Sequence, residues 1–345
     1  MQAVILVGGE GRRLRPLTDT RPKPMMPLVD RPFVAHQLDH LRRHGITDVV
    51  FSCGYRPDAL EAYFGDGSDV GMRVRYVVDP EPLGTAGAIK NAEELLDGDA
   101  VFVLNGDILT DLDLGAMIAR HRETGAVGTL ALTPVEDPSA FGLVRLHDDF
   151  SVEAFVEKPS REELRPGEPF RINAGTYLLE PAALESIPAG RACSIEREVF
   201  PQLAAGGRLF GYPSDAYWRD IGTPASYLAA HHDVLSGAVL TESPIGAAYL
   251  GPGARIGAGA SVDPLSSLGA CAAVGPSATV TGSVVGEEAV IGDGAALVDA
   301  ILGAGVLVGA GAHIGEGAVV GDGARIAAGI SVDGSEPIPT GATVG

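Results

Sequence analysis

The sequence predicts an α/β fold in which a mostly parallel sheet, covered by helices, is followed by a parallel β-helix. Two observations support this prediction. Strand-like and helix-like segments alternate over residues 1 to about 235, and a six-residue repeat runs from Leu250 to Val344. A chain of 345 residues is also longer than one hydrophobic core usually accommodates. We therefore expect domains at 1–235 and 250–345, joined by a linker at 236–249.

Four short runs rich in β-branched residues predict strands buried on both faces. These runs are Val4–Val7, Val49–Cys53, Val74–Val78 and Val101–Leu104. Helical patterns lie between and after them, over Pro32–His44, Pro57–Phe64, Ala86–Leu96 and Leu112–Glu123. Gly45 and Gly125 are expected to end the first and the last of these helices. Ligands of such sheets bind beyond the carboxyl ends of the strands.

An aliphatic residue recurs every six positions in the C-terminal part, with two five-residue steps that reset the phase. The three groups are Leu250, Ile256, Val262, Leu268, Val274 and Val280; then Val285, Ile291 and Leu297; then Leu302, Val308, Ile314, Val320, Ile326, Val332, Ile338 and Val344. This period is typical of a hexapeptide β-helix, in which three units form a coil of about 18 residues. A disordered Gly-rich linker would lack the aliphatic phase. Solenoid ends and faces often mediate self-association, so we expect a homo-oligomer.

The composition argues against two classes of partner. The net charge of −20 is unsuited to nucleic acid, and no apolar run approaches the ~20 residues of a membrane-spanning helix. The apolar stretch Ala3–Val7 is short and runs into glycines, so it fits a buried strand rather than a signal peptide. We therefore expect a cytoplasmic protein.

Lysine is scarce, because the 25 basic residues comprise 22 arginines and only Lys23, Lys90 and Lys158. The chain uses arginine wherever either cation suffices, so a remaining lysine favours a position that needs a compact ammonium, as at a phosphate. The alternative is a surface position without function, and for Lys90 the two interpretations are balanced.

A glycine-rich loop with clustered cations follows the first predicted strand. It runs Val7-Gly8-Gly9-Glu10-Gly11-Arg12-Arg13-Leu14-Arg15-Pro16-Leu17-Thr18 and reaches Arg21-Pro22-Lys23-Pro24. Glycine permits positive φ and close approach of backbone N–H groups to phosphate, and the cations supply charge. The loop lacks the Gly-Lys-Ser/Thr of a P-loop, and Leu14 stands where a dinucleotide fingerprint has its third glycine. We predict a phosphate-binding loop of another type.

Two carboxylates are candidate metal ligands. Asp107 follows the strand Val101–Leu104 in Asn105-Gly106-Asp107, where it could hold Mg²⁺ near phosphates or simply form a turn. Asp220, in Tyr217-Trp218-Arg219-Asp220-Ile221-Gly222-Thr223-Pro224, is the best partner for it. Its alternative roles are a structural ion pair or a loop contact before a helix.

Two further motifs suit a sugar phosphate and a base. Glu157-Lys158-Pro159 places a carboxylate beside an ammonium, and Asn173 in Arg171–Tyr177 could bind hydroxyls. A solvated ion pair at a strand end is the alternative. Gly84-Thr85-Ala86-Gly87 opens a predicted helix with small residues that permit close approach to a flat base, or that merely cap the helix.

Together these motifs resemble those of the sugar-phosphate nucleotidylyltransferases, and most closely mannose-1-phosphate guanylyltransferase, over nearly the whole chain. The resemblance rests on Gly8-Gly9-x-Gly11-x-Arg13-Leu14, Pro22-Lys23-Pro24, Leu83-Gly84-Thr85-Ala86-Gly87, Asn105-Gly106-Asp107, Glu157-Lys158-Pro159, Asn173-Ala174-Gly175, Ser194–Pro201 and Trp218-x-Asp220-Ile221-Gly222-Thr223-Pro224. It implies a Rossmann-like mixed sheet of the nucleotidyltransferase type, with a left-handed β-helix after it.

The resemblance also implies a role for each motif. Arg13 and Lys23 would hold the triphosphate and, with Lys158, form the catalytic set. The nucleotide would contact Gly8, Gly9, Gly11, Arg12, Gly84 and Thr85. The sugar phosphate would contact Lys158, Glu157, Asn173 and Gly142, and Asp107 and Asp220 would ligate Mg²⁺. Arg12 departs from the family, which usually has Thr or Ser there, and this puts one phosphate contact in doubt.

The implied reaction needs no nucleophilic side chain. A sugar-1-phosphate, whose second pKa is about 6, attacks the α-phosphorus of a nucleoside triphosphate and releases pyrophosphate. GTP with mannose-1-phosphate is the favoured pair, and glucose-1-phosphate or a cyclitol phosphate with GTP or another triphosphate is the alternative. Less favoured are a bifunctional nucleotidyl/acyltransferase, for which the β-helix offers only His313, Arg255 and Arg325, and an inactive regulatory subunit.

Overall fold

The computed structural model describes residues 1–54, 57–165 and 169–345. The chain forms two compact units, and neither is continuous in sequence. The first comprises Met1–Gly9 and Gln37–Trp218, and the second comprises Glu10–His36 and Arg219–Gly345. The glycine-rich loop is therefore shared between the units. The division expected at 236–249 stays a prediction.

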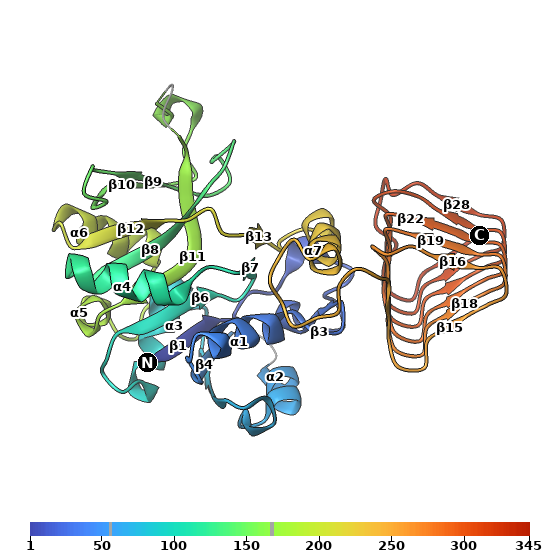
Figure 1. Cartoon of the computed structure of the whole chain (residues 1–345), viewed down its shortest axis with the longest axis horizontal. Helices are drawn as coiled ribbons and strands as arrows, with labels where there is room; N and C mark the ends of the chain where they lie inside the picture. The colour runs from blue at the N-terminus through green and yellow to red at the C-terminus, as the bar shows by residue number, and fades with distance from the viewer. Residues whose placement is uncertain (55–56, 166–168) are drawn as a thin grey trace. The chain divides into compact units, whose positions relative to one another are not determined.

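Nine strands of the described chain form the mixed sheet of the first unit (Figure 1). Their order is β10-β9-β11-β6-β1-β4-β5, and β8 pairs with both β11 and β12. The strands are β1 (Gln2–Leu6), β4 (Asp48–Cys53), β5 (Arg73–Val78), β6 (Val101–Asn105), β8 (Gly128–Pro134), β9 (Gly142–Leu146), β10 (Val152–Glu157), β11 (Arg171–Leu179) and β12 (Leu209–Pro213). Parallel pairing of β1 with β4 and β6 puts Leu6 opposite Asn105. The predicted α/β fold class is confirmed.

Helices cover this sheet, and the four predicted ones are present. They are α1 (Phe33–Arg43), α2 (Pro57–Phe64), α3 (Gly84–Ala92) and α4 (Leu114–Thr124), with α5 (Pro181–Glu185) and α6 (Phe200–Ala205) in addition. The third is shorter than predicted, because a 3₁₀ turn takes over at Glu93–Leu95. Asp113 caps α4 by accepting from Ala116 N, and Gly125 ends that helix at φ 61°. A short two-stranded hairpin, β2 (Pro27–Leu28) and β3 (Arg31–Pro32), precedes α1 in the second unit.

The C-terminal repeat folds as predicted into three faces of stacked parallel strands, consistent with a left-handed β-helix (Figure 1). The faces are β14-β17-β20-β23-β26, β15-β18-β21-β24-β27-β29 and β16-β19-β22-β25-β28. The strands are β14 (Tyr249–Leu250), β15 (Arg255–Ile256), β16 (Ser261–Val262), β17 (Ser267–Leu268), β18 (Ala273–Val274), β19 (Thr279–Thr281), β20 (Val284–Val285), β21 (Val290–Ile291), β22 (Ala296–Val298), β23 (Ile301–Leu302), β24 (Leu307–Val308), β25 (His313–Ile314), β26 (Val319–Val320), β27 (Arg325–Ile326), β28 (Ser331–Val332) and β29 (Thr343–Val344). The aliphatic side chains of the six-residue periods from Leu268 onward point inward and form the core together with alanines.

The first face of the β-helix is covered on its outside as well. Its outward residues Val284, Ile301 and Val319 are buried, although alternate residues of a strand point away from the core. Helix α7 (Pro224–Ser236) packs on this face: the ring of His231 lies 3.1 Å from Ser267 Oγ, and that of His232 lies 2.8 Å from Gly282 O. Helix α7 is thus in contact with the β-helix within the second unit.

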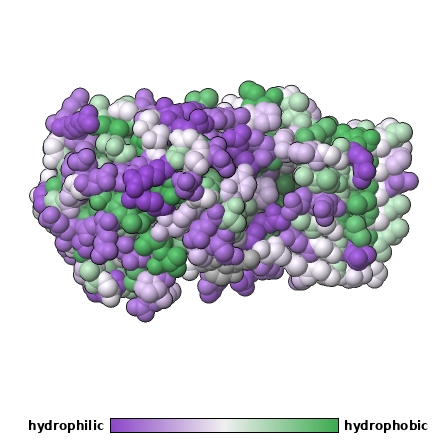
Figure 2. Space-filling view, turned by 90° about the horizontal axis from the view of Figure 1, so that it is seen from below, coloured by the Kyte–Doolittle hydropathy of each residue, from purple (hydrophilic) through white to green (hydrophobic). Residues whose placement is uncertain are grey.

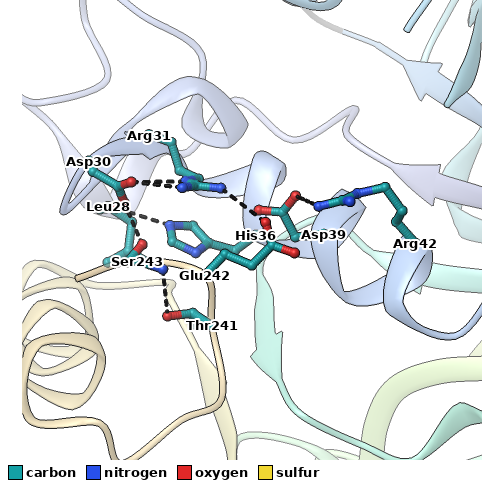
Figure 3. Close-up of polar contacts among 9 residues, drawn as sticks. All are labelled: Leu28, Asp30, Arg31, His36, Asp39, Arg42, Thr241, Glu242 and Ser243. Atoms are coloured by element: carbon teal, nitrogen blue, oxygen red, sulfur yellow. Dashed lines mark hydrogen bonds and ion pairs between the residues drawn. The ribbon is translucent and has the colours of Figure 1, made fainter. Parts of the chain in front are cut away.

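The β2–β3 hairpin and the segment after α7 are joined by polar contacts (Figure 3). Arg31 forms a two-nitrogen ion pair with Asp30, and Asp30 also accepts from Ser243 Oγ. These contacts lower the pKa of Asp30 against the opposing effect of its burial. On α1 of the first unit, Arg42 donates to Asp39 over 3.2 Å.

The first coil of the β-helix leaves inward-type residues open to solvent. Leu250 and Ile256 are 47% and 43% exposed because no coil lies beneath them. Outward-facing Val290 is also exposed. On the face drawn in Figure 2, polar side chains cover much of the first unit, whereas the β-helix presents broader apolar and neutral bands.

Candidate functional site

The predicted site residues divide between the two units. The first unit holds Gly8, Gly9, Gly84, Thr85, Asp107, Gly142, Glu157, Lys158 and Asn173, and the second holds Gly11, Arg12, Arg13, Lys23 and Asp220.

In the first unit, glycines allow the chain after β6 to approach the end of β1, and the chain after β1 to approach the chain after β4. A Cβ on Gly106 would stand 2.5 Å from Leu6 O, and one on Gly8 would stand 3.3 Å from Gly54 N. Asp107 follows Gly106 and is half-buried. Gln37 of α1 fixes this turn by donating to Asn105 O and Ile108 O, both over 2.9 Å. The sheet thus presents Asp107 at the carboxyl end of β6, as predicted.

Small residues at the start of α3 serve contact with the chain itself. Gly84 has φ 68°, and a Cβ there would stand 2.7 Å from Cys193 O. The Thr85 hydroxyl donates to Glu196 Oε2 over 2.7 Å and accepts from Ile195 N over 2.9 Å. The Thr85 hydroxyl is thus engaged within the chain, and the role of Gly84 and Thr85 at the base stays a prediction.

Glu157 and Gly142 face each other across β10 and β9. A Cβ on Gly142 would stand 2.6 Å from the Phe155 ring and 3.1 Å from Glu157 Oε2, so glycine makes room for both. Burial raises the pKa of Glu157, the nearby Glu196 carboxylate raises it further, and Lys158 and Arg197 oppose the rise. Two carboxylates, Glu157 and Glu196, thus share this region with the Lys158 ammonium.

Lys158 has a strained backbone. Its φ is 52°, in the left-handed region that costs a residue with a Cβ about 1–2 kcal/mol. Its backbone N donates to Phe141 O over 2.9 Å. The side chain is exposed, and within the described residues its ammonium has no hydrogen bond or ion pair. Lys90, in contrast, pairs with Glu93 over 2.6 Å and donates to Leu184 O over 3.1 Å, which is a structural role.

The amide of Asn173 is already engaged within the chain. Its Nδ2 donates to Tyr177 Oη over 2.8 Å, and its Oδ1 accepts from Gly175 N over 3.0 Å. Gly175 has φ 71° where the pairing of β11 with β8 shifts register. Asn173 therefore shapes the bulge of β11, and one N–H and one lone pair of its amide are left for a ligand.

In the second unit, the glycine-rich loop folds tightly on itself. Gly11 has φ 66°, and a Cβ there would stand 3.0 Å from the Cβ of Lys23 and 3.1 Å from Thr18 Cγ2. Thr18 Oγ1 donates to Gly11 O over 2.9 Å. Gly8 and Gly9 do not adopt positive φ, so among the three predicted glycines the left-handed turn belongs to Gly11 alone.

The two arginines of this loop differ in their surroundings. Arg12 is exposed and forms a forked ion pair with Glu10, at 2.6 and 3.1 Å, which lowers the pKa of Glu10. Arg13 instead lies at Gly222, where a Cβ would stand 2.6 Å from Arg13 Nη2 and 2.7 Å from Asp220 Oδ1. Gly222 therefore lets the Arg13 guanidinium and the Asp220 carboxylate converge. Arg219 forms an ion pair with Asp233 of α7 through two of its nitrogens, at 2.7 and 2.6 Å.

Sequence reasoning assigned no role to Glu196 or Gly222. Both lie in motifs that supported the resemblance, Ser194–Pro201 and Trp218–Pro224. Their place in these motifs was the one signal that could have identified them. The contact from Thr85 to Glu196 spans 111 positions, and the sequence gives no sign of it.

The two candidate metal ligands lie in different units, Asp107 in the first and Asp220 in the second. Among the residues that the structure describes, no group of three or more His, Cys, Asp or Glu side chains could hold a metal ion. Asp107 and Asp220 supply hard oxygen donors, and Mg²⁺ is commonly held by one or two carboxylates plus phosphates and water.

Among the residues that the structure describes, no helix is both long and apolar enough to cross a bilayer.

The chain is similar to curated mannose-1-phosphate guanylyltransferases. The enzyme of Mycobacterium tuberculosis is 44% identical over 239 residues, which are 69% of this chain and 65% of that protein. The mannose-1-phosphate guanyltransferase of Aspergillus fumigatus is 40% identical over 233 residues, 66% of this chain and 62% of that protein. The match thus spans less than two thirds of the length of these relatives.

Solved structures and family models agree with this similarity. HddC from Yersinia pseudotuberculosis, complexed with GMP-PN, is 30% identical with a TM-score of 0.57, covering 66% of this chain and 97% of that one. A Bacillus anthracis chain at 24% identity and a TM-score of 0.61, covering 70% of this chain and 98% of its own, shares the fold. The family model described as GMPPB C-terminal domain matches residues 244–341, and the one described as Nucleotidyl transferase matches residues 2–237. Because the latter covers more than half of the sequence, the chain belongs to the nucleotidyl transferase family.

Proposed function

We propose that the protein is a sugar-1-phosphate nucleotidylyltransferase that joins GTP and mannose-1-phosphate to give GDP-mannose and pyrophosphate. The observation that carries this proposal is the state of Lys158. Its backbone is left-handed, and its exposed ammonium lies next to Glu157 in a chain that has only three lysines among its 25 basic residues. A left-handed backbone at an accessible cation supports the proposal of a ligand role.

The sugar phosphate would bind to Lys158, with Glu157, Asn173 and Gly142 at the sugar. A compact ammonium suits a phosphate monoester, and the remaining N–H and lone pair of Asn173 suit hydroxyls. The triphosphate would bind to Arg13 and Lys23, which the folded loop around Gly11 holds in place. Gly8, Gly9, Gly11 and Arg12 would contribute phosphate contacts, and Gly84 and Thr85 would lie along the base through their backbone.

The chemistry follows from charge and position. The dianionic sugar phosphate forms a bond from its oxygen to the α-phosphorus, and the bond from that phosphorus to the pyrophosphate oxygen breaks. Arg13 and Lys23 neutralise charge that builds up on the phosphates, and Lys158 orients the attacking oxygen. Asp107 and Asp220 would hold Mg²⁺, which supplies further neutralisation of the departing pyrophosphate.

The choice of substrates rests on the named relatives. Mannose-1-phosphate and GTP are the substrates that the names of the Mycobacterium and Aspergillus proteins indicate. Glucose-1-phosphate or a cyclitol phosphate is the runner-up acceptor. We also propose that the protein is a homo-oligomer and that it works in the cytoplasm. The exposed first coil of the β-helix supports self-association.

A grid of reactions tests the proposal. Pyrophosphate release is measured with Mg²⁺ for each common nucleoside triphosphate against several sugar-1-phosphates and cyclitol phosphates. Release with GTP and mannose-1-phosphate alone is the expected result. Release with another pair would keep the reaction and change the substrate. No release with any pair would overturn the proposed activity.

A further inference from the structure

We propose that Asp322 of the β-helix is a positioning residue for the triphosphate loop and acts through Thr20 and Arg21. This inference rests on the proposed function of the loop. Thr20 and Arg21 stand between Arg13 and Lys23, in the part of the loop that belongs to the same compact unit as the β-helix. A contact made here bears directly on the position of Lys23, two residues after Arg21.

The Asp322 carboxylate contacts both loop residues. Thr20 Oγ1 donates to Asp322 Oδ2 over 2.5 Å, and Arg21 Nη2 lies 3.5 Å from the same oxygen. The other oxygen of Asp322 accepts from Ala304 N over 2.8 Å. The carboxylate side chain is only 16% exposed. Both of its oxygens are thus engaged, one by the β-helix and one by the loop.

The β-helix presents this carboxylate on a regular column of turns. Gly305 N donates to Glu287 O, and Gly323 N donates to Ala304 O, so the turns that hold Glu287, Ala304 and Asp322 stack on one another. A Cβ on Gly303 would stand 2.2 Å from Asp322 Oδ1, so glycine is required beneath the carboxylate.

Arg21 lies between two acids of this column. Its Nη2 is 3.6 Å from Glu287 Oε1 and 3.5 Å from Asp322 Oδ2, and small Ala304 separates the two turns. Two acids of the β-helix therefore lie within ion-pair distance of the Arg21 guanidinium. This assigns Arg21 to holding the loop rather than to binding phosphate.

The loop itself transmits the contact to Lys23. Met25 N donates to Pro22 O and Met26 N to Lys23 O, which forms a 3₁₀ turn directly after Arg21. Lys23 in turn packs on Gly11. Release of Thr20 and Arg21 should therefore loosen the triphosphate-binding cations without altering the residues that would hold the sugar phosphate.

Steady-state kinetics of full-length variants test the proposal. In Asp322→Ala and Thr20→Val we expect KM for the triphosphate to rise on the order of tenfold, with KM for the sugar phosphate unchanged. Thr20→Ser keeps the hydroxyl and should restore wild-type values. The double variant Thr20→Val/Asp322→Ala should have the same KM for the triphosphate as Asp322→Ala alone. Asp322→Ala already removes the acceptor of the Thr20 hydroxyl, so the second change breaks no further contact.

Asp293→Asn is the matched control, since Asp293 is an exposed acid on a different β-helix turn. It should behave as wild type. Equal effects in Asp293→Asn, or equal changes in both KM values, would overturn the positioning role. If Asp322→Ala fails to fold, Thr20→Val still tests the contact, because Thr20 is exposed and its replacement leaves the β-helix unchanged.

Hydrogen exchange keeps the inference testable should the proposed activity fail. Amides of residues 10–25 should exchange faster in Asp322→Ala and Thr20→Val than in wild type, and those of Asp293→Asn should not. A wild-type protein without activity on any substrate pair would refute the proposed function only. Unchanged exchange in the loop would refute the positioning role, whatever the activity.

Discussion

At the residue scale, the distinction between ammonium and guanidinium can be tested at Lys158. Lys158→Arg keeps the charge but replaces a compact donor with a planar fork on a strained backbone. We expect kcat/KM for the sugar phosphate to fall roughly 10- to 100-fold, or about 1.4–2.7 kcal/mol of transition-state stabilisation. Lys90→Arg is the control, since Lys90 pairs with Glu93, and it should retain activity. Near-wild-type kinetics in Lys158→Arg would remove Lys158 from the site.

Gly222 tests whether the Arg13 and Asp220 side chains must converge. Its φ is not positive, so alanine is allowed by the backbone, but the new Cβ would meet Arg13 Nη2 at 2.6 Å and Asp220 Oδ1 at 2.7 Å. Gly222→Ala should therefore displace both groups and reduce kcat/KM on the order of tenfold or more, with little change in melting temperature. In Gly206→Ala the nearest atom is 3.5 Å from the new Cβ, and activity should persist. A fully active Gly222→Ala would show that the convergence is not needed.

At the element scale, local patterns predicted most of the fold. The hexad phase placed an aliphatic at each β-helix strand, because coils stack only on their neighbours and the repeat fixes the register. Strands β1 and β6 followed from β-branched runs, and Gly125 from its position after α4. The extent of α3 was less predictable, since no side-chain cap marks the change to a 3₁₀ turn at Glu93–Leu95.

Helix α1 contains a buried histidine, His40, which should make the free energy of unfolding depend on pH. His40 is 3% exposed, and among the described residues neither ring nitrogen has a hydrogen-bond partner. Burial lowers its pKa to about 3, with His44 and Arg43 adding to the shift and Asp113 opposing it. The unfolded chain binds this proton near pH 6.5 and the folded chain does not, so stability is full above about pH 6.5 and falls by about 1.4 kcal/mol per unit as the pH drops toward 3.

Leucine at this position should remove the acid penalty. We expect His40→Leu to be at least as stable as wild type at pH 7.5, since it deletes two unsatisfied buried nitrogens. At pH 5.0 its advantage should grow by about 2 kcal/mol. Urea denaturation at the two pH values measures both quantities. An advantage that does not change with pH would mean that His40 titrates normally in the folded protein.

At the scale of the whole molecule, contacts between distant segments escaped sequence reasoning. The triphosphate loop was expected to belong to the N-terminal domain, yet residues 10–36 join the compact unit of the β-helix. Thr20 meets Asp322 across 302 positions, and nothing in the spacing of either motif indicates this. The motifs identified which residues carry charge. They could not show that Thr85 is engaged by Glu196, or that Arg21 is met by β-helix acids.

His231 of α7 contacts the β2–β3 hairpin and the β-helix, and its burial should make the stability of the second unit depend on pH. Its Nδ1 lies 3.3 Å from Val29 N and 3.1 Å from Ser267 Oγ, and its Nε2 lies 3.2 Å from Pro27 O. The two backbone contacts require a neutral ring, with Nδ1 accepting and Nε2–H donating. Burial lowers the pKa of His231 to about 3, with His232 and His36 adding to the shift and the Pro27 carbonyl opposing it.

His231→Gln should separate the structural role of this ring from its titration. At pH 7.5 the variant should lose about 1–3 kcal/mol, because buried polar groups lose their partner. Between pH 7.5 and 5.0 it should lose about 2 kcal/mol less than wild type, because one proton fewer distinguishes the folded and unfolded chains. His40 and His231 lie in different units, so His40→Leu/His231→Gln should lose about 4 kcal/mol less than wild type over the same interval. Denaturation curves of wild type, the two single variants and the double variant at both pH values measure these losses of unfolding free energy. If the effects of the two single variants do not add in the double variant, the two units do not unfold together.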